Sequence, residues 1–295
     1  MDALTYSVVI ATFERADALR DALASVARQT RAAAKIVIVD ASSGNATEHV
    51  TAEFPLLPIV YRRAERASAA LQRNQGSNEV ETPLIAFIDD DVVLEPELFA
   101  KLCGVFEARP DTGGVAARMN GASHAAPRGA LWWYYRLQAG FRDETFGARL
   151  FGPAINCFPC YDRASGDELI AADWLNLGCV LFRTDAFKRE LFPAFDGYSH
   201  MEDVHLSARI GRTHRLYFHA GACYDHFPAE SPAKRDRFRL GQMRIRNQAL
   251  VAREVLGRTG VRLAGQILAH RVFVSIFLAR FRPAGWKREL AGIWS

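Results

Sequence analysis

Short apolar runs rich in β-branched residues alternate with longer amphipathic stretches through the first part of this 295-residue chain. The runs that we expect to form buried strands are residues 7–11, 36–39, 59–61 and 84–88. Leu19, Leu23 and Val26 recur at helical spacing, and the Ala- and Gln-rich residues 67–80 predict a second helix. Strands separated by helices indicate an α/β, Rossmann-like fold, with a mostly parallel sheet flanked by helices.

Polar residues follow three of these runs where each strand is expected to end. Thr12, Glu14 and Arg15 follow the first run, and Asp40 follows the second. The segment Asp89-Asp90-Asp91 follows the fourth. The carboxyl ends of parallel strands meet at one edge of the sheet, where open α/β sheets bind their ligands. The sequence therefore predicts an active-site edge there.

Asp89, Asp90 and Asp91 form the sharpest of these polar clusters. Because alternate residues of an extended backbone point the same way, we expect Asp89 and Asp91 on one face and Asp90 on the other. Carboxylates this close repel one another unless cations compensate their charge. A hard divalent ion such as Mg²⁺ takes carboxylate oxygens as ligands. The alternative is a solvated acidic turn, but the position of the three acids at the predicted ligand-binding edge of the sheet favours a metal site.

Two further acidic sites each have a structural alternative. Asp40 could accept a hydrogen bond from a nucleobase or a ribose hydroxyl, or it could simply begin a turn or cap a helix. Glu202 and Asp203 stand at the predicted start of a helix, where acids often only stabilise the helix dipole. A carboxylate in this position could also act as a general base that removes a proton from a substrate hydroxyl.

His226 and the cysteines give weaker signals. His226 follows a predicted short strand and could add an imidazole to a metal site, although a single histidine is more often structural. Cys157 and Cys160 have CxxC spacing without a second pair, which favours a structural role. The odd number of cysteines, and an N-terminus without signal-peptide features, indicate a reducing compartment such as the cytoplasm.

The second half of the chain is less regular. Residues 121–173 have no clean periodicity and contain tryptophan, tyrosine, glycine and proline, so we expect a loop-rich region suited to an acceptor site. Regular structure is expected to return at residues 177–182, and a basic amphipathic helix is expected over residues 236–256. The net charge of +4 is too small to indicate nucleic-acid binding.

This pattern predicts one large domain with an appended segment. We expect residues 1–256 to form the main domain, with a first half at 1–118 that carries the predicted ligand edge and a second half at 119–256 that carries the loop-rich region. Residues 257–295 mix apolar residues with Arg and Lys, which predicts a basic amphipathic helical segment.

Such a helix can lie on an anionic membrane surface, and the alternatives are packing on the main domain or a homodimer contact. We expect no stretch near the ~18 apolar residues that span a bilayer. The longest C-terminal candidate, residues 272–279, is bounded by Arg271 and Arg280.

The ordered motifs resemble glycosyltransferase family 2, a group of inverting enzymes with the GT-A fold. Residues 7–15 resemble the family's opening strand and nucleotide-contacting loop, and residues 36–40 resemble its second strand. Ala41-Ser42 departs from the family's usual Asp-Gly after that strand. Residues 73–76 (Arg-Asn-Gln-Gly) and 87–91 are similar to two further family motifs. Glu202-Asp203 resembles the family's Glu-Asp motif.

The resemblance implies a role for each matching residue. The residues implied to contact the nucleotide-sugar donor are Thr12, Glu14, Arg15, Asp40, Arg73, Asp89 and Asp90. Asp89, Asp91 and His226 would hold Mg²⁺ or Mn²⁺. Asp203 would be the catalytic base, and Glu202 would support it or contact the acceptor.

The implied reaction transfers a hexose or deoxyhexose from a UDP- or dTDP-linked donor to a hydroxyl of a glycan or lipid-linked acceptor. Cell-surface polysaccharide synthesis at the inner face of the membrane would use such an enzyme. A sugar-phosphate nucleotidyltransferase is an alternative, but the loop at residues 12–15 lacks the glycines of its phosphate-binding loop. A non-catalytic nucleotide-sugar-binding protein is another, and the intact acidic motifs disfavour it.

Overall fold

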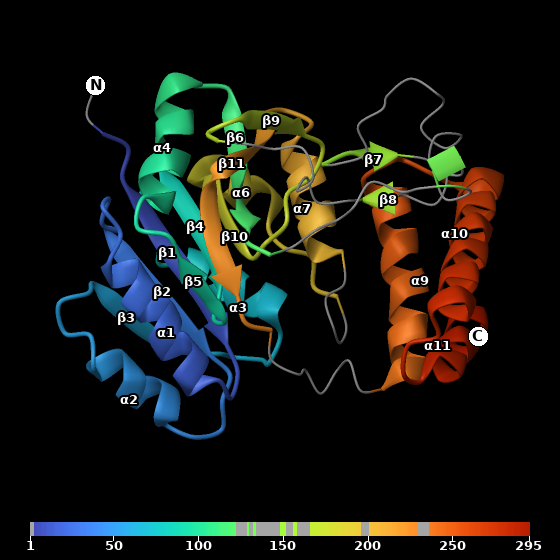
Figure 1. Ribbon diagram of the computed structural model, residues 1–295, viewed down its shortest axis with the longest axis horizontal. Helices are drawn as coiled ribbons and strands as arrows, with labels where there is room; N and C mark the ends of the chain where they lie inside the picture. Colours follow the sequence, from blue (N-terminus) through green and yellow to red (C-terminus); the bar gives the residue numbers. More distant parts are fainter. Residues whose placement is uncertain are drawn as a thin grey trace.

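A computed structural model describes residues 3–121, 129, 132–133, 148–151, 156–157, 166–195, 201–228 and 236–295. These residues form a nine-stranded sheet with the order β3-β2-β1-β4-β10-β6-β11-β5, in which β9 also pairs with β11 (Figure 1). The strands of this sheet are β1 (Tyr6–Thr12), β2 (Lys35–Asp40), β3 (Ile59–Arg63), β4 (Leu84–Asp89), β5 (Val92–Leu94), β6 (Thr112–Met119), β9 (Leu169–Ala172), β10 (Cys179–Arg183) and β11 (Arg215–His226). A separate two-stranded pair joins β7 (Leu150–Phe151) to β8 (Asn156–Cys157).

Helices cover both faces of the sheet, as the alternating sequence pattern predicts. The helices are α1 (Ala16–Ala27), α2 (Ala46–Ala52), α3 (Ala69–Ser77), α4 (Leu98–Ala108), α6 (Thr184–Glu190), α7 (Glu202–Ile210), α9 (Arg237–Glu254), α10 (Gly260–Phe281) and α11 (Trp286–Trp294). Apolar residues of α1, α2 and α4 join one buried core, and those of α3, α6 and α7 join another. Within β1, Val8 and Ile10 belong to the first core and Val9 to the second, because successive strand residues point to opposite faces.

The four strands of the first part of the chain pair in parallel, and their register aligns their carboxyl ends. Thr12 lies opposite Asp40, and Asp40 lies opposite Arg63. Ala11 lies opposite Asp89 on the other side of β1. Beyond β4, the strand β10 enters antiparallel to both β4 and β6. β11 runs parallel to β6, and β5 and β9 pair antiparallel with β11, so most strands of the sheet run in one direction. The predicted fold class is confirmed, and the predicted edge gathers the polar residues.

Three helices at the C-terminal end of the chain pack side by side (Figure 1). Gly241 of α9 and Gly292 of α11 allow a close crossing, because a Cβ on either residue would overlap the backbone of the other helix. Glu289 of α11 is buried, and it pairs with Arg244 at 2.9 Å and with Arg237 at 3.4 Å. A buried carboxylate between two arginines therefore joins α11 to α9.

One expectation about this segment was wrong. Among the described residues, α10 is a helix of 22 residues that is long and apolar enough to cross a membrane, with a mean hydropathy of 1.4 over an 18-residue window. Only 17% of that window is buried inside the protein. The helix runs through Arg271, which does not interrupt it because a single charged side chain on a helix flank leaves the backbone hydrogen bonds intact. Length and composition alone are weak evidence for a span.

The loop-rich acceptor region expected at residues 121–173 lies mostly outside the described residues, and so does Cys160. Cys157 belongs to β8, but its side chain is not among those described. The free cysteines of the described part, Cys103, Cys179 and Cys223, are all buried.

Candidate active site

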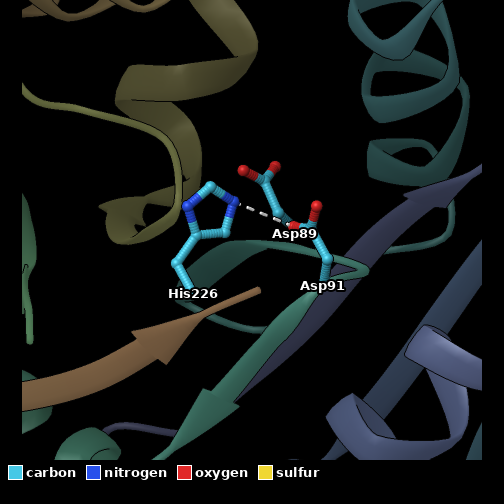
Figure 2. A group of neighbouring side chains, drawn as sticks. All are labelled: Asp89, Asp91 and His226. Carbon is cyan, nitrogen blue, oxygen red and sulfur yellow. Dashed lines mark ion pairs between the residues drawn. The ribbon is translucent and has the colours of Figure 1, made fainter. Parts of the chain in front are cut away.

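The acidic cluster lies where β4 ends and the chain turns into β5. Figure 2 shows Asp89 and Asp91 directed toward His226, which is the last residue of β11. One ligand atom from each residue lies within 4.8 Å of the others, and His226 Nε2 is 3.1 Å from Asp91 Oδ1. His226 comes close because β11 pairs with β5 so that it lies opposite Val92. The prediction that Asp89 and Asp91 share one side is confirmed.

These three side chains fit a divalent cation. Two carboxylates and one imidazole within 4.8 Å supply oxygen and nitrogen ligands on one side of an ion and leave the other side for substrate oxygens. Asp91 is nearly buried, with 6% of its side chain exposed, whereas Asp89 is 30% exposed. The Phe227 N–H donates to the Asp91 carbonyl at 2.9 Å and ties the end of β11 to the turn.

Asp90 points to the opposite side, toward the loop after β1. Its carboxylate accepts a hydrogen bond from Thr12 Oγ1 at 2.7 Å and pairs with Arg15 at 3.0 Å. Burial raises the pKa of Asp90 to about 6, against the opposing effects of Thr12 and Arg15. Arg15 also lies 3.1 Å from Asp91. The predicted residues Thr12 and Arg15 therefore meet the acidic cluster, and Arg15 offsets part of its charge.

Glu14, in the loop between β1 and α1, is bonded to the loop between β2 and α2. It accepts hydrogen bonds from the Ser43 N–H at 2.7 Å and the Ser43 hydroxyl at 2.8 Å, and these bonds lower its pKa. Its φ of 54° lies in the left-handed region, and the Ser42 hydroxyl accepts from its backbone N–H. The carboxylate is bonded to the neighbouring loop in this conformation, so its predicted donor contact stays a prediction.

Asp40 is fully buried at the end of β2. It accepts hydrogen bonds from the Ser42 N–H at 2.8 Å, from the Tyr61 hydroxyl at 2.8 Å and from Arg63 at 3.3 Å. The carboxylate thus holds the ends of β2 and β3 together. Contact with a nucleobase stays a prediction, and it needs a different arrangement of these partners.

Arg73 of α3 joins the acidic cluster to the distant Glu202-Asp203 motif. Its guanidinium lies 2.7 Å from Asp89 and 2.5 Å from Glu202, although 129 residues separate Arg73 from Glu202. The side chain is only 8% exposed and lies over the ring of Phe192, 5.6 Å from its centre. Burial acts against the charge of Arg73, but Glu202 and Asp89 outweigh it and raise the pKa of the guanidinium.

Asp203 lies in the first turn of α7, as predicted, beside Glu202. Its carboxylate is half-buried and accepts a hydrogen bond from the Val204 N–H at 2.8 Å. Burial raises the pKa of Asp203 to about 7, and the charge of Glu202 acts in the same direction. The Val204 N–H and Arg73 oppose this rise. A carboxylate with a pKa near neutrality is well matched to general-base catalysis at the pH of a cell.

Comparison with known proteins identifies the family. Residues 7–160, more than half of the chain, match the family model described as glycosyl transferase family 2. The chain belongs to glycosyl transferase family 2. Among curated proteins, it is 34% identical over 102 residues to the uncharacterized glycosyltransferase YwdF of Bacillus subtilis (strain 168). That match covers 34% of this chain and 38% of YwdF, so it spans well under half of the relative.

Two solved structures have a similar GT-A fold. TarS 1-349 of S. aureus aligns with a TM-score of 0.59 at 16% identity, covering 96% of this chain and 74% of that one. TarS 1-349 has also been solved in complex with UDP and with UDP-GlcNAc. The mannosyltransferase PcManGT from Pyrobaculum calidifontis, in complex with GDP-Man and Mn²⁺, aligns with a TM-score of 0.59 at 13% identity, covering 100% and 86%. At 16% and 13% identity, these similarities show a shared fold.

Sequence reasoning missed two residues that hold parts of this family 2 site in place. Asn74 exchanges two hydrogen bonds of 2.9 Å with the backbone of Phe192 and so holds the ring over Arg73. Gln72 donates to the backbone carbonyls of Thr12 at 2.9 Å and Val39 at 2.8 Å. Both lie next to Arg73 in the sequence, so the motif at residues 73–76 pointed to Asn74 without showing what it contacts.

Three further residues were missed, one at the end of β3 and two in or just after α7. Arg63 follows one expected strand as Asp40 follows another. If these two strands had been paired in parallel, Arg63 would have been predicted to lie opposite Asp40. His205 of α7 bonds through Nε2 to Glu254 at the end of α9, at 2.6 Å. Arg212, just beyond α7, donates to the backbone carbonyls of Glu254 at 2.6 Å and of Val255 at 2.8 Å. No sequence signal indicated that α7 and α9 are joined in this way.

Proposed function

We propose that this chain transfers a sugar from a nucleoside-diphosphate sugar, UDP- or dTDP-linked, to an acceptor hydroxyl with inversion of configuration. The observation that carries the proposal is the bridge formed by Arg73. Its buried guanidinium contacts the candidate metal ligand Asp89 and also Glu202, which stands next to the candidate base Asp203. This contact supports a donor site and a proton-accepting site next to each other, as a single displacement requires.

On the donor side, Asp89, Asp91 and His226 would hold Mn²⁺ or Mg²⁺. When bound, such an ion would offset the negative charge that develops on the departing diphosphate. Arg15, beside Asp90 and Asp91, adds a cation at the same edge. Nucleotides bound to TarS, and GDP-Man with Mn²⁺ bound to PcManGT, support a nucleoside-diphosphate sugar donor with a divalent ion in a fold of this kind.

On the acceptor side, Asp203 accepts the proton of the acceptor hydroxyl while the hydroxyl oxygen forms a bond to the anomeric carbon. The bond from that carbon to the diphosphate oxygen breaks in the same step, and the nucleoside diphosphate leaves with the electron pair. A carboxylate with a pKa of about 7 is ionised often enough at neutral pH to accept the proton. Arg73 fixes the adjacent Glu202 and thereby orients the start of α7.

The proposal extends to the biological setting. A hexose or deoxyhexose would be transferred to a glycan or lipid-linked acceptor during cell-surface polysaccharide synthesis. The reaction would take place in the cytoplasm, with peripheral contact between the C-terminal segment and the inner face of the membrane. Homodimer formation through that segment is the competing arrangement.

The decisive experiment measures donor turnover. The purified chain is incubated with UDP-, dTDP- and GDP-sugars and Mn²⁺. The assay follows release of the nucleoside diphosphate as the sugar passes to water or to an added glycan. We expect release from donors of one base by the native chain and a large loss in Asp203→Asn, which should still bind that donor. Asp17→Asn changes an acid that is 96% exposed and pairs with Arg20, and it serves as the matched control. Donor binding without turnover would favour a binding protein.

A further inference from the structure

The helix α10 has one buried and one exposed apolar face. It buries Gln266, Val274 and Leu278 and packs against α9 and α11. The opposite face carries four large apolar residues at helical spacing, which we call the α10 stripe: Val261, Leu268, Val272 and Ile276. Their exposed fractions are 89%, 54%, 43% and 64%. Residues spaced by four and seven positions lie on one side of a helix, so the stripe is continuous.

The segment that contains this stripe has a strongly positive net charge. Residues 257–295 contain seven of the 37 Lys and Arg residues but only one of the 33 Asp and Glu residues. The segment therefore carries six net positive charges, while the remaining 256 residues carry two net negative charges. Its single acid, Glu289, is buried between Arg237 and Arg244 and adds no negative charge to the surface.

A tryptophan from α11 extends the exposed apolar surface. Trp294 is 48% exposed and donates from Nε1 to the Ser275 hydroxyl of α10 at 2.9 Å. Arg271 lies over its ring, 5.6 Å from the centre. Tryptophan and arginine side by side are typical of protein surfaces at the boundary between lipid headgroups and hydrocarbon.

We propose that the α10 stripe docks on an anionic phospholipid bilayer, with α10 lying in the plane of the interface. In this orientation the apolar stripe enters the acyl boundary while Arg262, Arg271 and Arg280 reach the phosphates beside it. The docking itself is independent of sugar transfer. Its use in presenting a lipid-linked acceptor to Asp203 rests on the proposed function.

The two other arrangements fit the same surface less well. A membrane-spanning α10 would carry Arg271, near the middle of the helix, into the hydrocarbon and would separate Val274 and Leu278 from α9 and α11. A symmetric contact between two copies would bring two segments of six net positive charges face to face. An anionic bilayer would bury the apolar stripe and would also attract the positive charges of the segment.

Co-sedimentation with vesicles tests the proposal on the full chain. One set of vesicles contains equal amounts of phosphatidylglycerol and phosphatidylcholine, and the other contains phosphatidylcholine alone. We expect strong binding to the anionic vesicles that weakens as salt is added, and much weaker binding to the neutral ones. The double variant Arg262→Gln and Arg280→Gln should lower the anionic partition coefficient roughly 30-fold, from the effect of two juxtamembrane arginines.

The stripe variant combines Leu268→Gln, Val272→Gln and Ile276→Gln and should lose most binding. Leu56→Gln, at a residue that is 97% exposed elsewhere, is the matched control and should bind as the native chain does. Thermal melting and calorimetric binding of a nucleoside diphosphate show that each variant is folded, and they test the donor site separately.

Three results would overturn the inference. One is that the native chain does not bind anionic vesicles, and another is that the stripe variant still binds them. The third is bound protein that resists alkaline carbonate extraction, which would indicate a spanning helix. Dimers that the stripe variant abolishes, together with absent vesicle binding, would assign the surface to a second copy.

Discussion

The environment of Asp203 predicts how the activity depends on pH. Burial raises the pKa of its carboxyl to about 7, and a general base works only when it is ionised. Below this pKa the ionised fraction falls about tenfold per pH unit, so kcat/KM at pH 5 should be roughly one hundredth of its plateau. Asp203→Asn should lose the base altogether and lower kcat by about 10² to 10⁴.

Glu202→Gln provides an internal test of the electrostatic cause. The charge of Glu202 contributes to the raised pKa of Asp203, so removing it should move the acidic limb of the profile to lower pH, whatever happens to the maximal rate. The assay is release of nucleoside diphosphate at several donor concentrations between pH 5 and pH 9. Asp17→Asn should leave the midpoint unchanged. A native-like rate in Asp203→Asn, or a midpoint that rises in Glu202→Gln, would refute the reasoning.

Three further predictions concern stability. An unfolded aspartate has a pKa near 4, whereas the pKa of Asp203 in the native state is about 7. Between about pH 4 and pH 7 the native state therefore binds a proton that the unfolded state releases, so the contribution of Asp203 to stability falls as the pH rises through this range. Asp203→Asn should flatten this dependence in urea unfolding, and an unchanged slope would contradict the assignment. Arg73→Gln leaves Asp89 and Glu202 without their shared buried cation and should cost about 3–5 kcal/mol of unfolding free energy, whereas a loss below about 1 kcal/mol would show that the bridge matters little. Burial lowers the pKa of His205, so below a pH of about 6.5 the unfolded state binds a proton that the native state does not, and the free energy of unfolding should fall as the pH drops. His205→Gln should weaken this fall in urea unfolding at several pH values, and a steeper fall in the variant would contradict the assignment.

Local sequence pattern predicted the elements that set up the site. Apolar runs predicted β1 to β4, and the acids at their ends fell on one edge because parallel register aligns the carboxyl ends. Because side chains alternate along an extended backbone, we predicted that Asp89 and Asp91 point to one side and Asp90 to the other, as the structure shows. Glu202-Asp203 begins a helix as expected.

Long-range pairing was beyond local pattern. The run at residues 177–182 showed no sign that β10 would lie antiparallel between β4 and β6. The strand before His226 was expected to be short, yet β11 has 12 residues because it pairs with β6, β5 and β9. The Arg73 bridge joins residues 129 positions apart, and only the fold brings them together. A search for uninterrupted apolar residues missed the length of α10, because the helix continues through Arg271 and Arg280.

The most direct test of the central claim is calorimetric titration of UDP, dTDP and GDP into the native chain and Asp91→Asn, each with and without Mn²⁺. The account predicts that one nucleotide binds the native chain much more tightly with Mn²⁺ and that Asp91→Asn loses this dependence. Binding of none of the three in the presence of Mn²⁺, or the same Mn²⁺ dependence in Asp91→Asn, would contradict a metal-dependent donor site at this edge of the sheet.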